Sequence, residues 1–204
     1  NSESIHHISR VQRITSILLE RLCQKTDIYG LSGMDRYLIT TASALHDIGK
    51  VAIDDRILNA HDLTPEQTAI LHTHPILGAQ MLENLSQYQD EPLVKFAIQI
   101  CRWHHERWDG SGYPDGRKSD DIPIAAQVVA LADAYDGLTG KRDKREALSQ
   151  EEAVAALTAG THGAFNPLLL ECLRDVEDRL AEETEADAPP PPKKGILFDE
   201  TVLG

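Results

Sequence analysis

The sequence has few cysteines, few aromatic residues and a deficit of positive charge. Its 204 residues include 3 Cys, 5 % aromatic residues, and 20 Lys and Arg against 33 Asp and Glu, which gives a formal net charge of −13. The cysteines are widely spaced and form no Cys-x-x-Cys pair, which favours reduced thiols and a cytosolic protein. The negative charge excludes a protein that coats a nucleic acid polymer, because such binding needs Lys and Arg to displace counterions from phosphates.

Long apolar segments are also missing. The longest apolar run, residues 122–132, is interrupted by Gln127, whereas a membrane-spanning helix needs about 18 apolar residues or more. We therefore expect no membrane segment, and no signal peptide opens the sequence. The first residue is Asn1 rather than Met, which favours a fragment of a longer protein. The 41 % of hydrophobic residues are enough for the core of one domain.

Most of the chain shows helical periodicity, with apolar residues recurring every three to five positions. This pattern predicts an amphipathic helix over about residues 5–22 and a second over about 34–46. Capping boxes, prolines and apolar spacing predict further helices that begin near residues 64, 76, 92, 123, 149 and 166. We therefore predict an all-α bundle of about seven to eight helices over residues 1–180. Acidic residues and four consecutive prolines mark residues 181–204 as a linker and C-terminal tail.

Histidine and aspartate gather where helices are expected to end. Five of the nine histidines do so, namely His7, His46, His74, His104 and His105. Asp47 follows His46, and Asp133 lies within an apolar helix, where a carboxylate needs a cation. Imidazole nitrogen together with carboxylate oxygen suits iron, manganese, zinc or nickel. Adjacent helical residues point about 100° apart, so the His-Asp and His-His pairs favour two bridged metals over one.

Each of these residues also has a simpler interpretation. A single helical histidine is more often solvated or hydrogen-bonded than a metal ligand, and a buried aspartate is often paired with an arginine. We interpret the other four histidines in this way, as solvated or core-edge residues: His6, His61, His72 and His162. The metal hypothesis depends on the ordered combination, which is far more specific than any single member.

That combination consists of four blocks. They are His46-Asp-Ile-Gly-Lys50, then His74 with Gly78 four residues later, then His104-His-Glu-Arg-Trp-Asp-Gly-Ser-Gly-Tyr-Pro114, then Asp133 in Ala-Asp-Ala-Tyr-Asp-Gly-Leu-Thr139. In this order the blocks resemble the HD-GYP family, a branch of the HD phosphohydrolases that acts on the bacterial messenger cyclic di-GMP. The resemblance covers about residues 3–175 and implies an HD-type helical bundle.

The resemblance also implies a set of metal ligands. These are His7, His46, Asp47, His74, His104, His105 and Asp133, with Asp47 as the bridging carboxylate. Glu3 lies four residues before His7 on the same helical face and corresponds to a ligand that family members with three metals carry. Its other interpretation is a first-turn acid that interacts with the helix dipole. The implied cofactors are two or three divalent transition-metal ions, iron or manganese first, with nickel and zinc as alternatives.

The implied reaction is hydrolysis of cyclic di-GMP to pGpG, with further cleavage to GMP left open, by a hydroxide that bridges the metals. Asp47 and Lys50 are the candidate catalytic residues, Lys50 by contacting a phosphoryl oxygen. Tyr113 is expected to contact the nucleotide, and Asp136, three residues after Asp133, is expected to orient a ligand or Lys50. Where the family usually has Ser-x-Arg-Pro-Tyr-Lys, this chain has Gly140-Lys-Arg-Asp-Lys-Arg145. Arg142 and Arg145 are therefore the candidates for binding the second phosphate or a guanine edge.

Two other functions stay open. The domain could be a catalytically weak module that binds cyclic di-GMP or a diguanylate cyclase, or a two-metal phosphohydrolase for pGpG or another nucleotide. We further expect an upstream sensory or receiver domain, a homodimer through the first helix, and a location in the bacterial cytoplasm.

Overall fold

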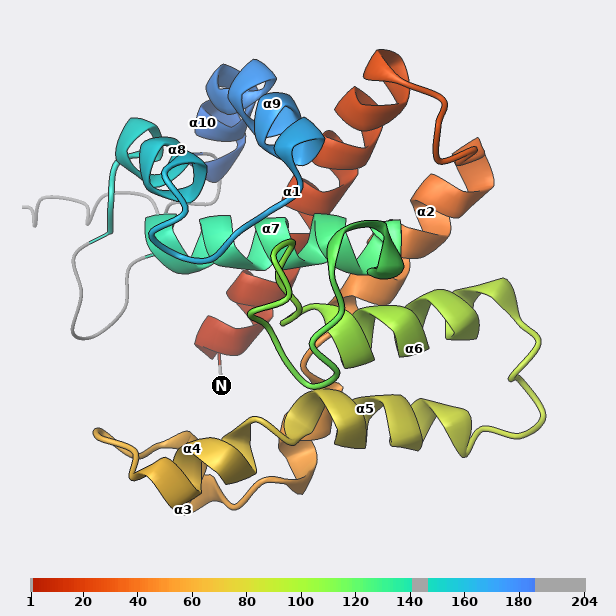
Figure 1. Cartoon of the computed structure of the whole chain (residues 1–204), viewed down its shortest axis with the longest axis vertical. Coiled ribbons are helices and arrows are strands. Elements are labelled where there is room, and N and C mark those ends of the chain that lie inside the picture. Colours follow the sequence, from red (N-terminus) through yellow and green to blue (C-terminus); the bar gives the residue numbers. More distant parts are fainter. Residues whose placement is uncertain (1, 141–146, 186–204) are drawn as a thin grey trace, which may run out of the picture.

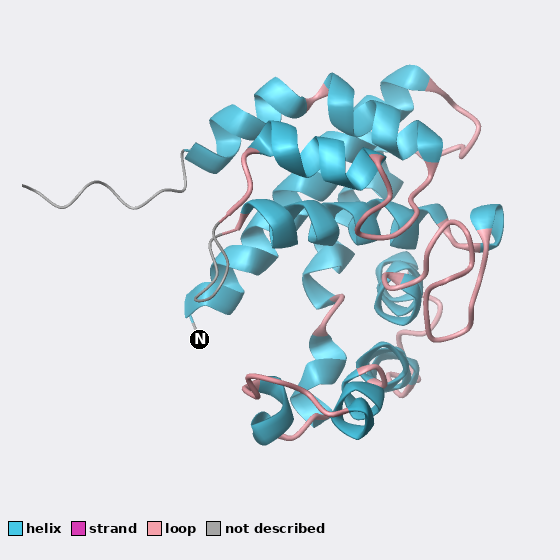
Figure 2. Cartoon of the chain, turned by 60° about the vertical axis from the view of Figure 1, so that its left-hand side comes forward, coloured by secondary structure: helices cyan, strands magenta, loops and turns pink. Residues whose placement is uncertain are grey.

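The computed structural model describes the backbone of residues 2–140 and 147–185, and the side chains of residues 5–140 and 147–182 (Figure 1). Within these residues the chain is helical and contains no β-strand, as Figure 2 shows, so the predicted all-α class is confirmed. The helices are α1 (Ser2–Lys25), α2 (Gly33–Ala42), α3 (Asp55–Leu58), α4 (Pro65–Leu71), α5 (His74–Glu83), α6 (Pro92–Trp103), α7 (Ile124–Thr139), α8 (Gln150–Thr158), α9 (Pro167–Asp175) and α10 (Glu177–Glu185), with 3-10 turns η1 (Ser43–Leu45), η2 (Ile48–Ala52) and η3 (Ser119–Asp121).

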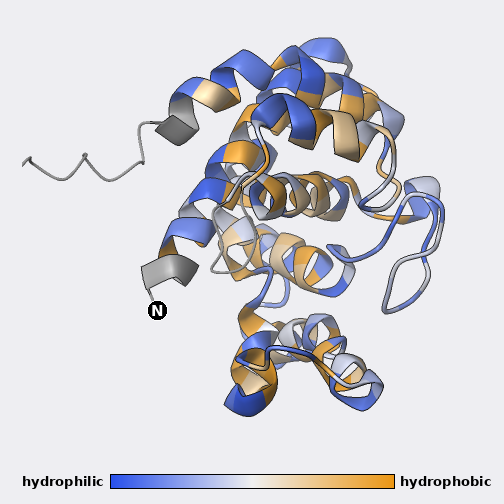
Figure 3. Cartoon of the chain, turned by 90° about the vertical axis from the view of Figure 1, so that its left-hand side faces the viewer, coloured by the Kyte–Doolittle hydropathy of each residue, from blue (hydrophilic) through white to orange (hydrophobic). Residues whose placement is uncertain are grey.

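Helix α7 forms the centre of the core. Residues 125–132 of this helix are all buried, and α7 packs against α1, α6 and α8. Helix α1 contributes Val11, Ile14 and Leu18, whose spacing of three and four residues places them on one buried face. Figure 3 shows hydrophobic and hydrophilic residues alternating along the helices of the bundle, as amphipathic helices require. This packing places α1 beside α7, which lies far from it in the sequence.

Local signals predicted several helix boundaries correctly. Thr64 and Ser149 each accept from the backbone amide three residues later, and the side chains of Gln67 and Glu152 bond back to the cap amides. The new helix predicted to begin near residue 76 is also confirmed, because α4 ends at Leu71 and α5 begins at His74. Proline fits in the first turn of α5, where its missing amide hydrogen has no intrahelical partner to lose.

Two predicted boundaries are wrong. The second helix does not continue to His46 but ends at Ala42, where the chain tightens into η1 between α1 and α6. The last helix is divided at Val176, whose φ of −115° and ψ of 9° end α9 before α10 begins. Neither position carries glycine or proline, so tertiary packing rather than local sequence sets both ends.

Helices α3 and α4 lie together to one side of the main bundle, next to α5 (Figure 1). Helix α3 was not predicted, because its four residues are too short for a periodic signal. Helix α10 runs through residue 180 to Glu185, and the predicted tail beyond it lies outside the described residues. Of the helices described, none combines the length and the apolar character needed to cross a membrane.

Candidate metal centre

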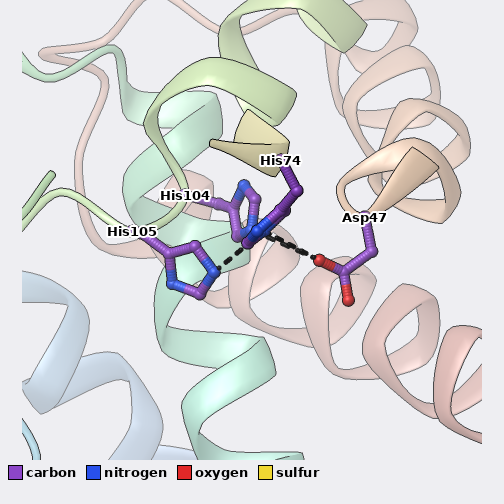
Figure 4. A group of neighbouring side chains, drawn as sticks. All are labelled: Asp47, His74, His104 and His105. Carbon is purple, nitrogen blue, oxygen red and sulfur yellow. Dashed lines mark hydrogen bonds and ion pairs between the residues drawn. The ribbon is translucent and has the colours of Figure 1, made fainter. Parts of the chain in front are cut away.

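Helix ends bring the predicted ligands into one cluster. His46 and Asp47 lie between η1 and η2, His74 is the first residue of α5, and His104 and His105 follow α6 directly. Figure 4 shows the side chains of Asp47, His74, His104 and His105 pointing toward one another. One potential ligand atom from each of these four residues lies within 4.8 Å of every other. A second such group consists of His7, His46 and Asp47.

Asp47 belongs to both groups and directs a different oxygen to each. Its Oδ1 lies 3.2 Å from Nε2 of His74 and 3.7 Å from Nε2 of His104. Its Oδ2 lies 3.5 Å from Nε2 of His46. This is the arrangement that a carboxylate needs in order to bridge two metal ions.

Asp133 and His7 complete the second group. Oδ1 of Asp133 lies 3.5 Å from Nε2 of His7 and 4.0 Å from Nε2 of His46. The histidines that face this aspartate thus come from α1 and from the η1–η2 junction. The structure therefore brings together seven of the eight predicted metal ligands. The eighth, Glu3, lies in α1, but its side chain is outside the described residues.

Hydrogen bonds orient most of the imidazole rings. The Nδ1–H groups of His46, His74 and His104 donate to backbone carbonyl oxygens three or four residues earlier, at 2.8, 2.7 and 3.0 Å. A carbonyl can only accept, so this nitrogen carries the proton and a neutral ring presents the lone pair of Nε2 to the cluster. Histidine ligands of metals are held in the same way.

Several of the converging atoms are buried without a hydrogen-bond partner. They are Nε2 of His46, Nε2 of His104 and Oδ1 of Asp47. Buried polar atoms are normally hydrogen-bonded, so atoms without partners need an explanation. Here they face one another across the cluster, and imidazole nitrogen with carboxylate oxygen is a suitable donor set for a divalent transition metal. The residues present therefore fit a metal centre.

Burial and neighbouring charges keep the ligands in the forms that bind metal. Burial lowers the pKa of His46 and of His105, which favours neutral imidazoles. Burial alone would raise the pKa of Asp47, but its contacts with His104 and His74 outweigh burial and hold the pKa well below its ordinary value. His7 differs, because its hydrogen bond to Asp136 raises its pKa.

The family described as HD domain matches residues 1–167. The chain belongs to the HD domain family. It is 36 % identical over 200 residues to a "Probable cyclic di-GMP phosphodiesterase" of Vibrio cholerae serotype O1, which covers 92 % of this chain and 45 % of the relative. It is 39 % identical over 173 residues to the "3'3'-cGAMP-specific phosphodiesterase 2" of the same organism, which covers 84 % of this chain and 32 % of the relative. The chain thus spans less than half the length of these curated relatives.

A solved structure is similar as well. The chain matches Bd1817, an HDG"Y"P protein from Bdellovibrio bacteriovorus, with a TM-score of 0.64 and 25 % sequence identity over 85 % of this chain and 52 % of the other. Together with the relatives, this match confirms the family that the motif blocks indicated.

Close packing of the backbone explains why glycine occupies position 49 in the His46-Asp-Ile-Gly-Lys50 block. A Cβ atom on Gly49 would overlap the carbonyl oxygen of His74 and the backbone nitrogen of Gly78. Because Gly49 has no side chain, η2 lies directly against α5. This close contact places Asp47, two residues before Gly49, beside His74.

Asp136 holds His7 in place. Its Oδ2 accepts from Nδ1 of His7 at 2.7 Å, and its Oδ1 accepts from Nε of Arg10 at 2.5 Å. Asp136 was expected to orient either a ligand or Lys50, and in the structure it contacts His7, one of the predicted ligands. Arg10 was missed, although its position three residues after His7 on the same face of α1 is a usable signal.

The loop that follows α6 folds back over the cluster. The buried carboxylate of Glu106, which sequence reasoning left without a role, accepts from the backbone amides of Asp115 and Arg117 at 2.8 and 3.0 Å. A Cβ on Gly112 would overlap the backbone of residues 105–107. The ring of Tyr113 consequently lies against His105, with 4.7 Å between ring centroids. Its other face is covered by His72, at 4.0 Å.

The remaining predicted residues concern substrate. Nζ of Lys50 lies 2.5 Å from Oδ2 of Asp47, and the Lys50 side chain is 40 % exposed. It is therefore placed beside the cluster and open to an incoming molecule. Arg142 and Arg145 lie outside the described residues.

Proposed function

We propose that this HD domain hydrolyses a cyclic dinucleotide, with cyclic di-GMP as substrate and pGpG as product. The observation that carries the proposal is Asp47, which directs one oxygen to Nε2 of His46 and the other to Nε2 of His104, two buried atoms that lack hydrogen-bond partners. A carboxylate shared in this way between two neutral-imidazole sites suits two-metal hydrolysis of a phosphodiester. The names of the relatives support a cyclic dinucleotide as the substrate class.

The metal ions would supply acidity and positive charge. Two divalent ions, if held by these ligands, would lower the pKa of bound water and offset the negative charge of the phosphoryl oxygens. The donor set of imidazoles and carboxylates suits iron, manganese, nickel or zinc, and the resemblance to the HD-GYP family puts iron or manganese first. Glu3 is proposed as a ligand of a third ion.

The chain's own residues would position the substrate and stabilise charge. Lys50 is close enough to Asp47 to approach a phosphoryl oxygen held at the same centre, and its exposed ammonium group would stabilise the charge that develops there. Asp136 and Arg10 keep the Nε2 of His7 directed at the centre. Arg142 and Arg145 are proposed to contact the second phosphate or a guanine edge.

A hybrid cyclic dinucleotide is the second candidate substrate. The observation that favours it is the 39 % identity to a relative named as specific for 3′3′-cGAMP. Both substrates are cyclic phosphodiesters, so the same metal centre could hydrolyse either one. The preference between them would depend on contacts with the bases.

The resemblance to the HD-GYP family carries further proposals about the whole protein. We propose that it acts in the bacterial cytoplasm, that a sensory or receiver domain controls it, and that it forms a homodimer through α1. On the same basis we propose that it binds a diguanylate cyclase domain.

The test uses protein purified anaerobically with iron or manganese. Metal content and turnover of cyclic di-GMP, 3′3′-cGAMP and pGpG are measured for the wild type, for Asp47→Asn, and for Asp62→Asn, an exposed aspartate outside the cluster. We expect about two metals per wild-type chain and cleavage of cyclic di-GMP. Asp47→Asn should lower turnover by more than about 100-fold, because even groups that only orient ligands cost 10–100-fold. Asp62→Asn should behave as the wild type.

The other outcomes separate the alternatives. A wild type with two metals that cleaves only pGpG contradicts the proposal and favours a linear-nucleotide phosphohydrolase. A wild type that binds cyclic di-GMP without cleaving any substrate favours an interaction module. A wild type that retains no metal overturns both enzymatic functions.

A further inference from the structure

One of the five clustered imidazoles is held differently from the rest. The Nδ1 atoms of His46, His74 and His104 donate to backbone carbonyls, and Nδ1 of His7 donates to Asp136. Among the hydrogen bonds between described residues, none involves Nδ1 of His105. The polar contact of this ring is made by Nε2, which lies 3.2 Å from Nε2 of His74 inside the cluster. The orientation of the His105 ring therefore has another cause.

Aromatic rings supply that cause. The ring of Tyr113 lies nearly parallel to the His105 ring, with centroids 4.7 Å apart and 22° between the planes. The ring of His72 lies on the opposite face of Tyr113, with centroids 4.0 Å apart and 13° between the planes. Near-parallel rings at such distances are stacked, and aromatic stacking contributes beyond the area that it buries. The three rings form a column that ends on a metal ligand.

Two members of the column, His72 and Tyr113, are held through their backbone amides. His72 directly follows α4, its amide donates to the carbonyls of Thr68 and Ile70, and it precedes the ligand His74 by two residues. The amide of Tyr113 donates to the carbonyl oxygen of His105 at 3.3 Å. Gly112 allows this return, because a side chain there would overlap the His105 carbonyl. The column thus connects two segments that each carry a ligand.

We propose that Tyr113 and His72 are positioning residues of the metal centre, which hold the His105 ring by stacking in place of the hydrogen bond that orients the other four imidazoles. The proposal rests on the metal centre of the proposed function and assigns a role to His72, which the sequence indicated only as a solvated or core-edge residue. It also limits the role of Tyr113 toward substrate. Both faces of this ring are covered, so a nucleotide base can stack on it only by displacing His72.

The proposal predicts that the ring of Tyr113 matters more than its hydroxyl group. Tyr113→Phe keeps the ring and should retain the wild-type affinity for Mn²⁺. Tyr113→Leu removes the stacking at similar bulk and should weaken Mn²⁺ binding about 10- to 100-fold, the loss typical of groups that orient ligands. His72→Ala should give a smaller loss, and His72→Phe should restore binding. His162→Ala is the matched control, because His162 is exposed and contacts Thr161 outside the column.

Two measurements test the column independently of catalysis. The first is NMR of the metal-free protein, in which stacking on Tyr113 shifts the His105 ring protons upfield. The shift should persist in Tyr113→Phe and disappear in Tyr113→Leu. The second is Mn²⁺ affinity, measured by competition with a chelator, with far-UV circular dichroism to confirm the fold of each variant.

The results distinguish this proposal from the proposed function. An absent upfield shift in the wild type, or wild-type Mn²⁺ affinity in folded Tyr113→Leu, overturns the column whatever the activity. Equal losses in Tyr113→Phe and Tyr113→Leu also overturn it, because the hydroxyl group would then be the active part. A rise in KM in His72→Ala with unchanged Mn²⁺ affinity would make His72 a substrate contact instead. If the wild type binds Mn²⁺ and shows the shift but cleaves no cyclic dinucleotide, the proposed function fails and the column stands.

Discussion

The metal centre has two halves that are anchored by different means. In the α5–α6 half (His74, His104 and His105), the rings of His74 and His104 bond to carbonyls of the turns that precede them. In the α1–α7 half (His7, His46 and Asp133), His46 bonds in the same local way to the carbonyl of Ser43, but the ring of His7 depends on Asp136, which is 129 residues away. The carbonyl bonds of His74 and His104 are therefore built by local backbone geometry, whereas His7 and Asp133 meet only because α1 packs against α7.

The contact between η2 and α5 offers the strongest way to damage the α5–α6 half. Gly49→Ala places a methyl group against the backbone of His74 and Gly78, so η2 must move away from α5 and carry Asp47 with it. We expect the free energy of unfolding to fall by about 1–3 kcal/mol, the usual cost of overpacking, together with a loss of metal affinity. Urea unfolding of the metal-free protein and chelator competition measure the two effects.

Gly33→Ala is the matched control for this substitution. A Cβ at Gly33 would meet only a flexible arginine end at 3.7 Å, so stability and metal affinity should be unchanged. If Gly49→Ala is as stable as Gly33→Ala and binds metal equally well, the close contact does not position Asp47.

Asp136→Asn tests the α1–α7 half alone. The neutral amide is a poorer acceptor for His7 and loses the charge that pairs with Arg10. We expect metal affinity at this half to fall about 10- to 100-fold, so that metal content after dialysis falls from two ions to one. Asp175→Asn is the control, because Asp175 pairs with Arg21 and Lys25 on α1 far from the centre. Loss of both metals in Asp136→Asn would show that the halves are not separately anchored.

The same difference explains how much of the centre the sequence could predict. The His-Asp and His-His pairs and the glycines near them are adjacent in the chain, and their anchoring carbonyls lie in the same turns. The α1–α7 half needs two distant helices side by side. The sequence therefore predicted that Asp136 orients a ligand or Lys50 without deciding between them, and it did not indicate Arg10. No sequence pattern indicated the contact of His72 with Tyr113, because the two residues belong to different segments of the chain.

The helix boundaries follow the same rule. The capping boxes at Thr64 and Ser149 are local hydrogen-bond patterns, and both were predicted correctly. The end of α2 at Ala42 and the break at Val176 depend on neighbouring helices, and both were missed. A helix boundary set by local hydrogen bonds can be predicted from the sequence. A boundary set by packing against other helices can be predicted only when the fold is known.

The halves should also differ in their response to pH. The hydrogen bond that His7 donates to Asp136 raises the pKa of His7, whereas burial lowers the pKa of His105 in the α5–α6 half. A protonated imidazole cannot bind metal. As the pH falls, His7 is protonated before His105, so we expect the α1–α7 half to release its metal at a higher pH than the α5–α6 half. Metal content after dialysis between pH 8 and pH 5 should show two steps, and a single step would contradict the prediction.

The stability of the metal-free protein gives an independent check of the direction in which the pKa of His7 is shifted. Because the folded state raises the pKa of His7, the His7–Asp136 pair stabilises the fold fully below the unfolded pKa of about 6.5 and loses this contribution as the pH rises through the raised value. His7 and Arg10 lower the pKa of Asp136 against the effect of burial. On the acid side, the pair therefore stops stabilising the fold only at the low pH at which Asp136 is itself protonated. His7→Gln should therefore reduce stability near pH 6 more than at pH 9, whereas His162→Gln should have the same small effect at both. An equal effect of His7→Gln at both values would mean that His7 is held by packing rather than by its charge, and the two halves would then release metal together.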